Sequence, residues 1–129
     1  MCDNIQKPGN MPDYPFVLFK SRVVNIATSG DMLVLEAEFP CLLDSFWVGN
    51  TANIEAHLYV SFLKAGKTST NASRIVRGNT FKVGEAREIL LSSVWYLEPG
   101  DAVYAGTDST KVPMSVVVSY RQLMNQPMT

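Results

Sequence analysis

The fold class is decided by the stretch Trp95-Tyr96-Leu97-Glu98-Pro99-Gly100-Asp101-Ala102-Val103-Tyr104-Ala105. Pro99 fixes φ for the first central position of a tight turn, and Gly100 tolerates the positive φ of the second, so residues 98–101 are predicted to form a type II turn. Aromatic and β-branched residues on both sides of the turn favour strands. We therefore expect two antiparallel strands that pair across this turn.

Similar short runs, separated by turn residues, continue along the rest of the chain. Residues 54–62 alternate, with Ile54, Ala56, Leu58, Val60 and Phe62 on one face and Glu55, His57, Tyr59 and Ser61 on the other, which predicts a half-buried strand. Strands are also predicted in 16–27 (one bent strand or two), 46–48, 74–77, 80–83, 87–91 and 114–120, with a connection over 40–45 and a turn at 78–79. Residues 31–39 fit either a helix or a strand; Pro40 and the β character of the neighbouring segments favour the strand.

Eight or nine short strands joined by turns predict an all-β protein, a single-domain antiparallel β-sandwich of jelly-roll-like type. We expect the sandwich to span residues 16–121, because 1–15 hold four prolines or glycines and predict an extended N-terminal arm. Residues 122–129 are expected to form a short C-terminal tail.

Composition limits the classes of partner. The 129 residues carry a net charge of −1, from 11 basic and 12 acidic side chains, which gives no field to attract nucleic acid or an anionic membrane. No stretch resembles a signal peptide or a membrane-spanning segment. Cys2 and Cys41 lack metal-ligand spacing and are expected to be free thiols in a reducing cytoplasm, where the protein is made or assembled. Apolar residues make up 47% of the chain, so contact through shape and apolar surface is favoured.

The sequence contains little that suggests catalysis. Its single histidine, His57, has Glu55 and Tyr59 two positions away on the same strand face, but a base and its orienting group also need a nucleophile or a metal. Gly66-Lys67-Thr68 matches the end of a phosphate-binding loop, yet the first glycine of that motif is replaced by Ser61. We therefore predict no enzyme activity, no cofactor, no metal and no small-molecule substrate.

The order of elements from Val48 to Tyr120 resembles that of small virion proteins of tailed bacteriophages, of the head decoration or cement type. The resemblance rests on Gly49-Asn50-Thr51 before the alternating strand, a polar loop, a strand pair that ends at Lys82-Val83, the turn at 98–101 and the final strand Val116-Val117-Val118-Ser119-Tyr120. It covers a little over half of the chain and describes an architecture, not an activity.

This resemblance implies a structural virion protein that binds the major capsid protein, or another virion protein, and stabilises the assembled head, with a homo-oligomer as a further expectation. The contact surface is expected among Met11, Tyr14, Trp47, Tyr59, Trp95 and Tyr96, although core burial is an equally good interpretation of the two tryptophans. Alternatives are a tail, baseplate or head-to-tail joining component, and a lectin-like ligand-binding β-sandwich.

Overall fold

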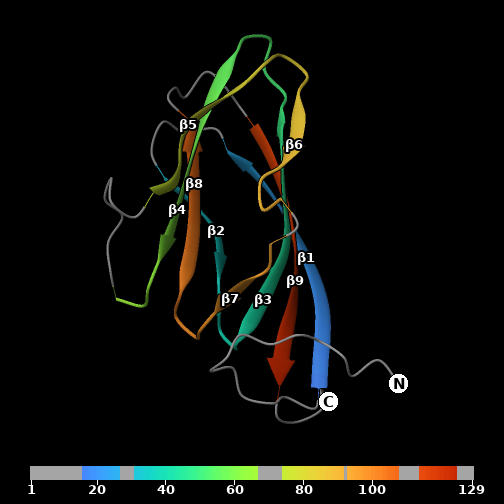
Figure 1. Ribbon diagram of the computed structural model, residues 1–129, viewed down its shortest axis with the longest axis vertical. Helices are drawn as coiled ribbons and strands as arrows, with labels where there is room; N and C mark the ends of the chain where they lie inside the picture. The colour runs from blue at the N-terminus through green and yellow to red at the C-terminus, as the bar shows by residue number, and fades with distance from the viewer. Residues whose placement is uncertain (1–15, 27–30, 67–73, 92, 108–113, 125–129) are drawn as a thin grey trace.

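The computed structural model describes residues 16–26, 31–66, 74–91, 93–107 and 114–124, and these form two antiparallel β-sheets packed face to face (Figure 1). The strands are β1 (Phe16–Ile26), β2 (Met32–Glu36), β3 (Cys41–Asn50), β4 (Ala56–Leu63), β5 (Arg74–Phe81), β6 (Ala86–Glu88), β7 (Trp95–Leu97), β8 (Ala102–Thr107) and β9 (Met114–Met124). None of the described residues is helical. The predicted all-β sandwich is confirmed. The predicted arm, residues 1–15, lies outside the described residues.

Sheet A has the order β1-β9-β3-β6, with β7 also paired to β3, and sheet B has the order β2-β8-β4-β5. If β6 and β7 are counted as one interrupted strand, the chain alternates between the sheets at every connection except the β4–β5 hairpin. This is the eight-stranded order of a jelly roll.

The core lies between the sheets and is built from alternate residues of each strand. Phe46 and Val48 of β3 pair in register with Val118 and Val116 of β9, and all four are fully buried. Sheet B contributes buried side chains in the same way, among them Ala56, Leu58, Val60, Val103 and Ala105. Alternation with a period of two places these residues on one face of each sheet, as expected for a sandwich.

The turn at 98–101 forms as predicted but does not make a hairpin. The Asp101 N–H donates to the Glu98 carbonyl at 2.9 Å, and Gly100 has φ of 93°. However, β7 belongs to sheet A and β8 to sheet B, so the expected pairing across the turn is wrong. The turn is tied instead to Ala37, which donates to the Asp101 carbonyl at 2.9 Å and accepts from the Gly100 N–H at 2.7 Å.

Three local expectations are also corrected. Residues 40–45 are not a connection, because β3 begins at Cys41 and pairs with β7 and β9 there. The turn expected at 78–79 is absent, and β5 runs through Gly78 as one strand with two register shifts against β4. Ile54 is 50% exposed, whereas Ser61, expected on the outer face, is fully buried. The strand interpretation of 31–39 is confirmed by β2.

The first half of β1 extends beyond the sandwich. Figure 1 shows the starting end of β1 and the finishing end of β9 projecting below the strands of sheet B. Val24 and Ile26 are buried, but the side chains of residues 16–23 are exposed or only partly buried. Both faces of this segment are therefore at least partly exposed, and the segment is not part of the core.

Candidate interaction surface

An apolar row crosses the outer face of sheet A. Val23 of β1 pairs in register with Val117 of β9, which in turn pairs with Trp47 of β3. Their side chains are 65%, 38% and 49% exposed, respectively. Cβ atoms directly opposite each other on neighbouring antiparallel strands lie about 4.5–5.5 Å apart, so the three side chains form one continuous strip. We call Val23, Val117 and Trp47 the outer row.

Phe19 is a further exposed apolar residue on this face of β1, separated from Val23 by Ser21. It lies four residues before Val23, hence on the same strand face, and is 76% exposed. Its register partner Arg121 forms a bidentate ion pair with Asp44, with Nε 2.9 Å from Oδ2 and the terminal nitrogen 2.7 Å from Oδ1. The guanidinium is thus held in place, which leaves a fixed polar border beside a large exposed ring.

The edge of sheet A is interrupted between β6 and β7, and there the side chain of Glu88 takes the place of strand pairing with β3. Between β6 and β7, the carboxylate of Glu88 accepts the Phe46 N–H at 2.7 Å and the Leu91 N–H at 2.6 Å. The Ile89 N–H donates to the Phe46 carbonyl at 2.9 Å. Leu91 is 82% exposed and has a positive φ of 53°, which is uncommon for a residue with a side chain.

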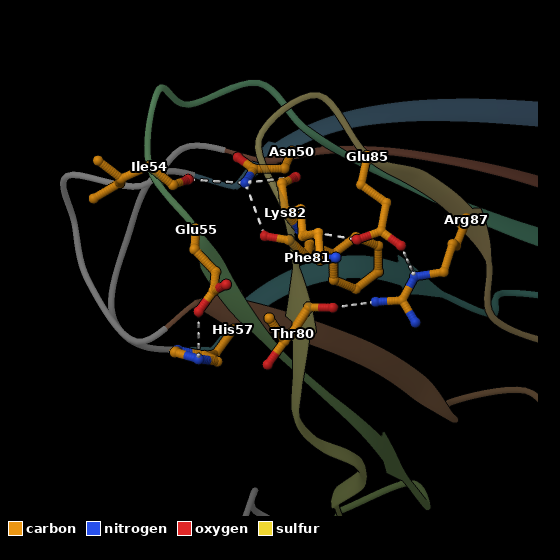
Figure 2. A network of polar contacts seen from close by, with 9 residues as sticks. All are labelled: Asn50, Ile54, Glu55, His57, Thr80, Phe81, Lys82, Glu85 and Arg87. Atoms are coloured by element: carbon orange, nitrogen blue, oxygen red, sulfur yellow. Dashed lines mark hydrogen bonds and ion pairs between the residues drawn. The ribbon is translucent and has the colours of Figure 1, made fainter.

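A polar network fastens one end of the sandwich (Figure 2). The side-chain amide of Asn50, which is buried, donates to the carbonyls of Ile54, Phe81 and Lys82 at 2.9, 3.1 and 3.2 Å. Its oxygen accepts the Ala52 N–H at 2.9 Å, which fixes the orientation of the amide. Asn50 therefore joins the end of β3 to the end of β5.

Arg87 adds a second tie to the same region. Its guanidinium lies 4.0 Å from the centre of the Phe81 ring and donates to the Thr80 carbonyl. Nε lies 3.0 Å from the Glu85 carboxylate, but the N–H is not directed at that oxygen and makes no hydrogen bond, so this contact is an ion pair only. The network is structural, because the Asn50 amide binds backbone groups and the Arg87 guanidinium contacts a backbone carbonyl, a ring and a carboxylate of neighbouring segments.

The residues considered for chemistry are not assembled into a reactive centre. The imidazole Nε2 of His57 lies 3.9 Å from the Glu55 carboxylate, with both side chains partly exposed on the outer side of sheet B (Figure 2). Burial raises the pKa of the Cys41 thiol to about 11, and the same cause raises that of the Tyr120 phenol. Within the described ranges, no three His, Cys, Asp or Glu side chains are grouped to hold a metal, and no helix could cross a membrane.

The aromatic residues selected from the sequence occupy different sites. Trp47 is in the outer row, whereas Trp95 packs edge to face on Phe62 with ring centres 6.2 Å apart, against the core. Tyr59 and Tyr96 are partly buried, on β4 and β7. Met11 and Tyr14 lie outside the described residues.

Sequence reasoning missed Phe19, Val23 and Val117. Val23 and Val117 belong to strands almost a hundred positions apart, and only their register places them side by side. The available signal was the alternation of each strand, because Phe19, Val23 and Val117 take outward positions, where a solvated face would be polar.

Comparisons with known proteins support the fold alone. No family model and no curated protein matches this chain. A solved structure from the work "Bacillus endospore appendages form a novel family of disulfide-linked pili" is similar, with a TM-score of 0.53 and 10% sequence identity over 94% of this chain and 98% of that one. At this identity the likeness concerns the arrangement of the strands.

Proposed function

We propose that this protein is a structural subunit that binds a repeating protein lattice through the outer row, in the manner of a phage head decoration protein. The observation that carries the proposal is the strip formed by Val23, Val117 and Trp47, exposed across three neighbouring strands. Contiguous apolar surface that includes a large aromatic ring is typical of protein contact sites.

The shape of the surface agrees with this role. The outer face of a sheet meets another protein over many small contacts, whereas small molecules bind in concave pockets. Each copy then contributes a modest binding energy, and lattice symmetry repeats the same contact many times. The major capsid protein is the partner that the sequence resemblance implies.

A second candidate is a subunit of a pilus or other filament. It is favoured by the likeness to the Bacillus appendage structure, which extends over nearly the whole of both chains. The two candidates share the outer row but differ in its partner, which is a second copy of the chain in a filament and a different protein on a capsid.

The test has two steps. Sedimentation velocity of the purified chain first shows whether it remains small at micromolar concentration or forms filaments. It is then mixed with phage heads that lack it, and with isolated tails, and each is pelleted. We expect a small species that pellets with heads; filaments formed by the chain alone would support the second candidate, and recovery with tails only would place it in the tail.

A further inference from the structure

Among the strands that the structure describes, the two sheets have four outer edges, β1 among them because it pairs only with β9, and these edges differ in how they are protected. Sheet A ends at β6 and β7 in strands of three residues each, and sheet B ends at β2, which has five residues and a register shift, and at β5, which has two register shifts. β1 is different. It is 11 residues long, and its register with β9 continues without a shift from Phe16 to Ile26. Short, bulged and interrupted edges resist the addition of another strand, whereas the backbone groups of a long regular edge can pair with one.

The side chains of β1 determine which kind of strand could pair with this edge. Phe19 and Val23 project on the outer face. Lys20 and Arg22 lie on the opposite face, in register with Tyr120 and Val118, and both are exposed. A strand added here would meet apolar side chains on one face and two cations on the other.

A second copy of β1 fits this edge poorly in the register that brings Phe19 and Val23 together. In an antiparallel pair that sets Phe19 against Val23 of the other copy, Lys20 stands directly opposite Arg22 of that copy, and the same conflict occurs twice by symmetry. The remaining edges of a second copy are the short or shifted ones. Charge complementarity therefore favours a different protein whose strand carries carboxylates at alternate positions.

We propose that the free edge of β1 accepts an extended segment of a partner protein as an additional antiparallel strand, with apolar residues alternating with Asp or Glu. The backbone of the segment would bond to β1, its apolar residues would extend the outer row past Phe19 and Val23, and its carboxylates would face Lys20 and Arg22. This inference rests on the proposed function, because it names the mode by which a lattice protein is held beside the outer row.

The experiment uses two capped nine-residue peptides, one alternating valine with glutamate and one alternating valine with lysine. Each is titrated against the whole chain and against a Lys20→Glu/Arg22→Glu variant, with backbone NMR shifts and amide hydrogen exchange as the readouts. The wild type should bind the glutamate peptide at least about fivefold more tightly, and the double variant should reverse this preference. Protection should appear in residues 16–26. A Lys82→Glu variant, which changes an exposed charge directly after the end of β5, should keep the wild-type preference.

Several results would overturn the inference: protection confined to β2 or β5, equal affinity for both peptides, or no binding of either. In that case, co-sedimentation with heads would still support the proposed function, so the two failures are distinguishable. The opposite outcome is also informative. If the peptide preference reverses with the charges but the chain pellets with neither heads nor tails, β1 would still be a strand-binding edge, and a virion lattice would not be its partner.

Discussion

Gly100 lies against Ala65 so closely that a Cβ at position 100 would be 2.8 Å from the Ala65 Cβ. Gly100 also has a φ of +93°, which side chains oppose. We expect Gly100→Ala to lower the free energy of unfolding by about 2–4 kcal/mol, from backbone strain and the clash together. Urea denaturation measures this change.

Gly66 provides the matched control, because it has a similar φ of +79° but open space around its missing Cβ. Gly66→Ala should therefore cost only the backbone term, about 1 kcal/mol. Equal losses for the two variants would show that the contact with Ala65 is unimportant.

The amide of Asn50 is expected to be a large single contributor to stability. Asn50→Ala would leave the carbonyls of Ile54, Phe81 and Lys82 without their donor, at a cost of about 2–3 kcal/mol in the free energy of unfolding. Asn79→Ala, at an exposed position on β5, should change stability by less than about 0.5 kcal/mol. A neutral Asn50→Ala would contradict the role assigned to the network.

The Cys41 thiol should be almost inert in the folded protein. With a pKa of about 11, roughly one thiol in a thousand is ionised at pH 8, and the side chain is only 2% exposed. In a Cys2→Ser variant, labelling by a disulfide reagent should be at least about a hundredfold slower than in denaturant. Labelling at the denatured rate would disprove this burial.

The same thiol should make stability depend on pH in the alkaline range. The unfolded thiol has its ordinary pKa of 9.0 and the folded one about 11, so stability is complete below pH 9 and falls as the pH rises toward 11. The raised pKa of Tyr120 adds a loss of the same sign at higher pH. Cys41→Ala should reduce the slope of the unfolding free energy against pH in this range. An unchanged slope would show that groups other than Cys41 cause the loss of stability.

Local chemistry made parts of the fold predictable. Pro99 and Gly100 specify the turn and its positive φ by themselves, and alternation marks the strands at 56–60 and 114–118. The sheet to which each strand belongs was not predictable in the same way. The separation of β7 from β8 depends on contacts of the turn with Ala37, Lys64 and Ala65, which are distant in sequence.

The start of β3 shows the same limit. Pro40 and the Asp44-Ser45 pair are typical of a connection, yet pairing with β7 and β9 on both sides makes this segment a strand, and a register shift between Leu43 and Ser45 accommodates Asp44. The candidate surface was predictable only at Trp47, a large ring visible in the sequence. Its neighbours in the outer row are ordinary valines until the register is known.

The most direct test of the central claim is the affinity of the chain for phage heads that lack it, compared between a Trp47→Ser and an Ile75→Ser variant. The two side chains are 49% and 48% exposed, but Ile75 lies on β5 of sheet B, away from the outer row. We expect Trp47→Ser to weaken binding by at least about tenfold, which corresponds to about 1.4 kcal/mol, while Ile75→Ser binds as the wild type does. Equal binding by both variants, with both shown to be folded, would contradict the outer row as the lattice contact.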